Sequence, residues 1–181
     1  GGRRGGAHGV MGAQRCSDYP IPHPWHFLQF EFVEGPTLGH VLADLRRRSA
    51  EPPIRLVRSL ALALCRALAL AHGSEDGGVF HGALTPDRVV LPNGNVSRAL
   101  IGGFGNVLFE RTATRVTDQL MSLDVEYLSP EQIVGDVTGP AADLYSLGVI
   151  LYAFATGRVP FPLEADDRAS VVAAHVRQRP I

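Results

Sequence analysis

One apolar stretch, residues 143–156, constrains the fold of this chain more than any other. A surface helix carries a single apolar stripe, whereas this stretch would be apolar nearly all round, so we expect a helix buried on every side. It is too short to cross a bilayer, which takes about 20 apolar residues. Gly139-Pro140 marks its start and Gly157 its end. The preceding chain should therefore wrap around this helix.

Composition excludes several classes of function. The formal net charge is −1, which gives no electrostatic reason to expect binding to nucleic acid or to an anionic membrane. All 17 basic residues are arginine, so chemistry that needs a lysine amine cannot come from this chain. Cys16 and Cys65 are expected to be free thiols in a cytoplasmic protein. No metal-ligand spacing, signal peptide or membrane-spanning run is present.

Two amphipathic helices are predicted before the apolar stretch. Thr37 can cap a helix that runs to about Arg48. A second helix follows Pro53 and ends at Gly73, because apolar residues between them recur at steps of three and four. Aromatic residues in 25–32 favour a strand.

Short β segments are predicted between the second helix and the apolar stretch. They cover residues 79–81, 89–91 and 96–101, and Asn93-Gly94 is a hairpin turn signal. Residues 105–120 contain few apolar side chains and indicate a long surface loop. The expected fold class is therefore mainly α with short β hairpins.

The order of these elements resembles the C-terminal lobe of a protein kinase, most closely the bacterial Ser/Thr kinases of eukaryotic type. The segments that carry the resemblance lie in the order and spacing of that family. They are FEFVEG at 30–35 (the hinge), HGALTPDR at 81–88 (the catalytic loop, usually HRDLKPEN), GFG at 103–105 (usually DFG), YLSPEQ at 127–132 and DLYSLG at 143–148.

The resemblance implies a domain organisation and four structural residues. Residues 25–181 would form the hinge and most of the helical lobe, with the N-terminal lobe largely absent and residues 1–24 disordered or truncated. His81 would tether the backbone, and Phe104 would pack in the core. Asp143 would accept backbone N–H bonds from the catalytic loop. Glu131 normally pairs with an arginine that would lie beyond Ile181, so that partner is not expected within these residues.

The same alignment removes the groups on which phosphoryl transfer depends. Catalysis in this family needs a carboxylate base, two Mg²⁺ ligands and a lysine on the phosphates. Ala83 stands at the position of the base, while Gly103 and Arg88 stand at the two metal-binding positions. Thr85 replaces the lysine of the catalytic loop. No metal site and no resident cofactor are therefore expected.

Three hypotheses of function remain open at this point. The first is a catalytically inactive kinase-like domain, a pseudokinase, that binds another protein as a regulatory scaffold. The second is a module that binds a nucleotide such as ATP without Mg²⁺ and without phosphoryl transfer. Hinge residues Glu31 and Val33 would contact the base, and Val90 would form the floor of the pocket. Arg88 would balance the negative charge of the phosphates in place of the metal. The third is a fragment of a larger ATP-dependent Ser/Thr kinase.

Overall fold

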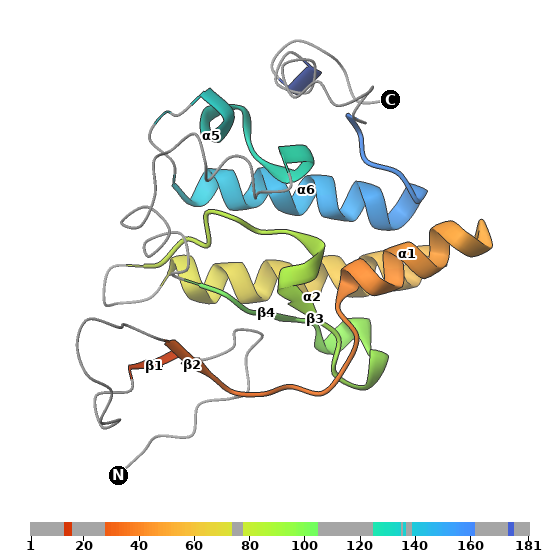
Figure 1. The fold of residues 1–181 in the computed structure, drawn as a ribbon, viewed down its shortest axis with the longest axis horizontal. Coiled ribbons are helices and arrows are strands. Elements are labelled where there is room, and N and C mark those ends of the chain that lie inside the picture. The colour runs from red at the N-terminus through yellow and green to blue at the C-terminus, as the bar shows by residue number, and fades with distance from the viewer. Residues whose placement is uncertain are drawn as a thin grey trace, which may run out of the picture.

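The three long elements of the structure are the helices α1 (Leu38–Arg48), α2 (Ile54–His72) and α6 (Pro140–Thr156) (Figure 1). The structure is a computed structural model that describes residues 13–15, 28–73, 78–104, 125–134, 136, 139–161 and 174–175. A short helix, α5 (Pro130–Val134), precedes α6, and the described 3-10 turns all lie between α2 and α5. The expected class, mainly α with short β segments, is confirmed.

The β structure consists of two small antiparallel pairs. Strand β1 (Ala13–Arg15) pairs with β2 (Leu28–Phe30), and β3 (Val89–Val90) pairs with β4 (Leu100–Ile101). β2 lies within the segment predicted to be a strand. β1 lies within the segment expected to be disordered, and the rest of residues 1–24 is outside the described residues.

Both amphipathic helices begin and end where the sequence predicts. The Thr37 side chain accepts a hydrogen bond from the backbone N–H of His40 at 3.3 Å, which caps α1. Pro53 directly precedes α2, and the N–H of Gly73 closes its last turn on the carbonyl of Ala69 at 3.0 Å. These capping signals act within a few residues, so they set the limits of the two helices independently of the tertiary structure.

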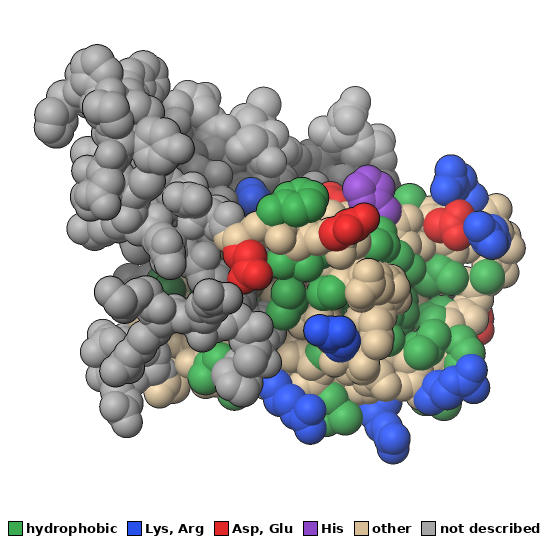
Figure 2. Space-filling model, turned by 90° about the horizontal axis from the view of Figure 1, so that it is seen from below, with side chains coloured by type: hydrophobic (Ala, Val, Ile, Leu, Met, Phe, Trp, Pro, Cys, Tyr) green, Lys and Arg blue, Asp and Glu red, His purple; other side chains and the backbone are tan. Residues whose placement is uncertain are grey.

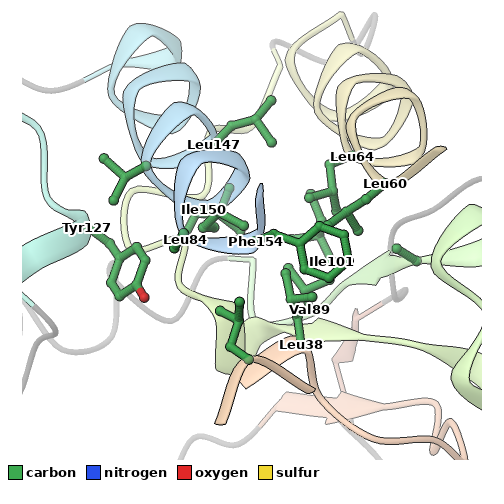
Figure 3. Close-up of a cluster of buried hydrophobic side chains, with 14 of the residues drawn as sticks. Leu38, Leu60, Leu64, Leu84, Val89, Ile101, Tyr127, Leu147, Ile150 and Phe154 are labelled. Carbon is green, nitrogen blue, oxygen red and sulfur yellow. The ribbon is translucent and has the colours of Figure 1, made fainter. Parts of the chain in front are cut away.

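The hydrophobic core lies where α2, α6 and the β3–β4 pair meet (Figure 3). Leu60 and Leu64 point from α2 towards Phe154 of α6 and Ile101 of β4, and all four side chains are buried. α1 contributes Leu38 to the same cluster. The core therefore fixes the catalytic-loop segment, which leads into β3, between α2 and α6.

Burial of α6 on every side is wrong. Leu147, Ile150 and Phe154 are buried, but Leu144 is 56% exposed and Gly148 is also exposed. At 100° per residue these last two lie on the same side of the helix. An apolar composition shows that a helix can be surrounded, but only the packing of other elements determines how many sides are covered.

Two β predictions also need correction. Residues 79–81 form no strand; the N–H of Val79 instead bonds the carbonyl of Ala71 at 2.8 Å, in the chain leaving α2. Asn93 and Gly94 do have the positive φ angles of a turn, 53° and 72°. However, two 3-10 turns, η2 (Pro92–Gly94) and η3 (Val96–Arg98), separate β3 from β4. Because η3 packs against α2, the predicted third strand is shortened to two residues.

Within the described ranges, no helix is both long and apolar enough to cross a membrane. The predicted loop at 105–120 lies outside those ranges.

Candidate functional site

The carboxylate of Asp143 ties the catalytic-loop segment to α6. Its Oδ2 accepts the backbone N–H of His81 at 2.7 Å, and its Oδ1 accepts the backbone N–H of Gly82 at 2.8 Å. Asp143 is 1% exposed, so these bonds form in a low-dielectric interior, where charge-assisted hydrogen bonds are strong. The backbone hydrogen bonds that the resemblance implied for Asp143 are present.

A third partner of Asp143 was missed by sequence reasoning. His72, the last residue of α2, places its Nε2 2.8 Å from Asp143 Oδ2, and its side chain is only 16% exposed. Nothing in the sequence distinguishes this histidine from an ordinary residue in the last turn of a helix. Asp143 therefore joins three segments that are distant in the chain: the end of α2, the loop at 81–82 and α6.

His81 is a buried anchor with both ring nitrogens engaged. Its Nε2 lies 2.9 Å from the carbonyl oxygen of Gly102, and its Nδ1 accepts the backbone N–H of Ala83 at 3.2 Å. Nε2 therefore carries the proton, and the ring is neutral. The ring of Phe104 meets it edge-on, with centroids 4.9 Å apart. The imidazole thus holds the catalytic-loop segment against the GFG segment.

The environment of His81 keeps it neutral. Burial lowers the pKa of His81 below its usual value of 6.5, and the positive charge of Arg88 lowers it further. The hydrogen bond to Gly102 and the charge of Asp143 act in the opposite direction but are weaker than burial. A ring that is neutral and fully engaged is suited to anchoring rather than to proton transfer.

The three altered catalytic positions come together around this imidazole. Ala83 bonds it directly and is 7% exposed. Gly103 follows the carbonyl that His81 contacts and has a φ of +87°. The carbonyl of Arg88 accepts the N–H of Gly102 at 2.9 Å, which links the loop to the segment before Gly103. A methyl group, a glycine and a guanidinium therefore share the region where the family's base and metal ligands are expected.

These residues do not fit a Mg²⁺ ion. Magnesium is bound by oxygen ligands in octahedral geometry, usually including one or two carboxylates. Ala83 and Gly103 have no side-chain oxygen, and Arg88 carries a positive charge. Among the described residues, no group of three or more His, Cys, Asp or Glu could hold a metal.

Of the residues predicted for nucleotide contact, Glu31 and Val33 lie in the segment before α1, Val90 lies on β3 and Arg88 in the turn before β3. Glu31 is exposed, and Val33 and Val90 are half-buried. The segment before α1 is held beside β3, because the N–H of Leu91 donates to the carbonyl of Pro36 at 2.9 Å. Thr37 also forms an isolated antiparallel bridge with Val90. The hinge segment and the predicted pocket floor are thus neighbours at this end.

α5 contributes two further polar contacts. Glu131, whose usual arginine partner was not expected here, lies close enough to Tyr145 to influence it: burial, with a smaller contribution from the Glu131 charge, raises the pKa of Tyr145 to about 12. Gln132 accepts the backbone N–H of Ser129 at 3.0 Å, and its amide donates to the carbonyl of Gly82. Sequence reasoning assigned no role to Gln132, which links α5 to the catalytic-loop segment.

A cavity of about 390 Å³ lies between α1 and the turns η1 (Pro86–Arg88) and η4 (Val125–Tyr127). Gly39, His40, Asp87 and Glu126 contribute to its lining. The hydroxyl of Thr37 donates to Asp87 Oδ1 at 3.1 Å, so the cap of α1 also holds one carboxylate of this cavity. This cavity could not be predicted from the sequence, because its walls come from three separate segments, 39–46, 86–87 and 126–127.

Comparison with known proteins agrees with this geometry. The family model for the protein kinase domain matches residues 15–179. The serine/threonine-protein kinase PknB of Mycobacterium leprae is 30% identical over 170 residues, which are 94% of this chain and 25% of the relative. The serine/threonine-protein kinase PksC of Streptomyces coelicolor is 30% identical over 156 residues, 86% of this chain and 27% of the relative. The chain thus spans about a quarter of the length of these relatives. Its sequence places it in the protein kinase domain family.

Proposed function

We propose that this chain is a kinase-like domain that acts by binding another protein and does not transfer phosphate. The observation that carries the proposal is the meeting of Ala83, Gly103 and Arg88 around the His81 anchor. The tethers at Asp143 and His81 remain, so the loop keeps its shape while its catalytic groups are absent. A retained scaffold with no reactive groups fits a role in recognition.

The magnitudes support a loss of transfer. A missing general base typically lowers the rate by about 10²–10⁴. Losing metal ligands removes several kcal/mol more of transition-state stabilisation. A unit positive charge about 5 Å from Mg²⁺ would repel it by roughly 6–7 kcal/mol at an effective dielectric near 20. These effects do not add simply, but each one opposes catalysis.

A radiolabelled-ATP transfer assay tests this proposal. The purified chain is incubated with a generic protein substrate in Mg²⁺ and, separately, in Mn²⁺, and no incorporation above the blank is expected. The comparison variant carries Ala83→Asp, Arg88→Asn and Gly103→Asp together, which restores the family's residue types. The proposal would be refuted by phosphate incorporation that co-purifies with the unmodified chain and is lost in the Arg88→Ala variant.

A second candidate is nucleotide binding without transfer, and the position of Arg88 favours it. Its side chain is half-buried, and within the described residues its guanidinium has no hydrogen bond or ion pair. A guanidinium is well suited to phosphate oxygens and could replace the metal as counter-charge. Glu31 and Val33 would then offer hinge backbone groups to the base, above Val90.

A thermal-shift titration with ATP, with and without Mg²⁺, separates the two candidates. A micromolar site at millimolar ATP should stabilise the fold by about 4 kcal/mol. No shift in either condition leaves the protein-binding function alone. A shift that needs no metal and is lost in Arg88→Ala supports nucleotide binding. A shift that requires Mg²⁺ would mean that the metal ligands lie elsewhere in the chain, and it would contradict the argument that the chain does not transfer phosphate.

A further inference from the structure

The outward face of α2 carries a ridge in which hydrophobic and basic side chains alternate. The ridge follows steps of four residues and consists of Ile54, Arg58, Leu62, Arg66 and Leu70. All five residues are exposed. Ile54, Leu62 and Leu70 are 80%, 49% and 51% exposed, values that are high for large aliphatic side chains. We refer to these five residues as the α2 ridge.

The charges of the α2 ridge have no counter-ion on the helix. No acidic residue occurs anywhere in α2. In the part of the chain that the structure describes, neither Arg58 nor Arg66 forms a salt bridge. The arginines of α1 differ, since Arg47 and Arg48 both pair with Asp44. Figure 2 shows basic side chains along the lower edge of the described surface, with hydrophobic side chains between them.

The geometry of the α2 ridge fits another helix. A row at steps of four residues is inclined to the helix axis and packs into the matching groove of a partner helix at a crossing angle of about −50°. The row also turns by about 40° around the helix at each step, so only its central part, Arg58, Leu62 and Arg66, shares one face, over about 12 Å of helix length. Leu62 lies between the two arginines on this face, and Ile54 and Leu70 lie at its edges.

The alternative occupants fit the α2 ridge less well. A second copy docked symmetrically would bring the same unpaired arginines against one another. A membrane surface requires a continuous apolar face on the helix. The continuous apolar face of α2, which contains Leu60, Leu64 and Leu68, is already buried in the core. The exposed side of α2 is therefore a mixed surface. A complementary partner would present hydrophobic and negatively charged groups in alternation.

We propose that the α2 ridge docks an acidic amphipathic helix of a partner protein, with an aliphatic side chain against Leu62 and carboxylates against Arg58 and Arg66. The proposal extends the protein-binding function above, but it does not require that the chain be inactive. An ATP-free binding assay therefore tests it separately from the transfer assay.

The probe is a fluorescein-labelled synthetic helix of about 20 residues, about 30 Å long. In this peptide Leu and Glu alternate along a row of positions four residues apart, and Ala and Gln occupy the other positions. A second peptide has Lys in place of each Glu. Binding to the full chain is followed by fluorescence anisotropy, and every variant is first checked for an unchanged melting temperature.

Two pairs of charge reversals are compared. Arg58→Glu with Arg66→Glu should weaken binding of the Glu peptide by roughly tenfold or more, because a favourable contact becomes a repulsion at two positions. Arg47→Glu with Arg48→Glu changes the net charge equally on α1, at side chains that are 76% and 72% exposed, and should leave binding nearly unchanged. Leu62→Ala should weaken binding without changing its salt dependence.

Saturable binding of the Glu peptide alone, lost with the α2 pair and kept with the α1 pair, supports the proposal. Equal effects of the two pairs, or equal binding of the Lys peptide, overturn it. Absence of saturable binding also overturns it. So does Arg58-dependent binding to phosphatidylserine vesicles without peptide binding, which would assign the surface to a membrane. Self-association that Leu62→Ala abolishes would assign it to a second copy.

Discussion

Asp143 Oδ2 lies 2.7 Å from the backbone nitrogen of His81, although the two residues are 62 positions apart in the chain. This hydrogen bond connects two of the segments that carry the kinase resemblance, α6 and the catalytic-loop segment. The residues that hold the loop in shape are different from Ala83, Arg88 and Gly103, which stand at the family's catalytic positions.

Replacing Asp143 with alanine should lower the free energy of unfolding by about 3–5 kcal/mol, because two buried backbone N–H groups and His72 would lose their acceptor. Urea unfolding followed by circular dichroism measures this change. The matched control is Asp44→Ala on α1, an exposed carboxylate with two surface ion pairs, which should cost about 1 kcal/mol or less. Similar losses in the two variants would show that the buried tether contributes little.

Leucine-to-alanine substitutions one turn apart test the one-sided exposure of α6. Leu147 is 5% exposed, so Leu147→Ala should cost about 2–5 kcal/mol through lost burial and a residual cavity. Leu144 is 56% exposed, so Leu144→Ala should cost less than about 1 kcal/mol. Both changes are made in the same helix, so helix propensity is matched. A large loss in Leu144→Ala would mean that this side of α6 is covered in the folded chain.

Gly35→Ala should destabilise the fold by about 2–4 kcal/mol, since an added Cβ would overlap the carbonyl oxygen of Leu91. The control is Gly94→Ala, whose φ of +72° is unfavourable for alanine but whose Cβ would meet nothing within 4 Å. Only the conformational cost of about 1 kcal/mol then applies. Thermal denaturation of the two variants separates steric overlap from backbone strain. Equal losses would show that the approach of the hinge to β3 is not tight.

Stability should decrease as the pH falls below about 6.5, the usual histidine pKa. The pKa of His81 is lowered in the folded state, chiefly by burial, and that of His175 is lowered for the same reason. Below pH 6.5 the unfolded chain therefore binds protons that the folded chain does not, and unfolding becomes easier until the lowered folded pKa is reached.

Urea midpoints between pH 7.5 and 5 measure this slope. His81→Gln keeps a donor at the position of Nε2 but cannot titrate, so its slope should be smaller than that of the unmodified chain. The part that remains would include the contribution of His175. An identical slope in His81→Gln would show that His81 is protonated in the folded state near its usual pKa.

Several parts of this structure were determined by the sequence alone. The limits of α1, α2 and α6 follow from caps, glycines and apolar periodicity, which act within a few residues and do not depend on distant packing. The replacement of catalytic residue types at Ala83, Arg88 and Gly103 was also visible, because the motifs lie at fixed positions along the chain.

Other features were decided only by the tertiary structure. His72 meets Asp143, Gln132 reaches Gly82, and one side of α6 stays exposed because elements far apart in the chain pack in one particular way. The separate faces of α2 illustrate the physical reason. Periodicity predicted which side of α2 is apolar enough to be buried, but only packing against α6 and β4 leaves the Arg58 and Leu62 side exposed. Local pattern fixes an element, and long-range contact fixes what that element can bind.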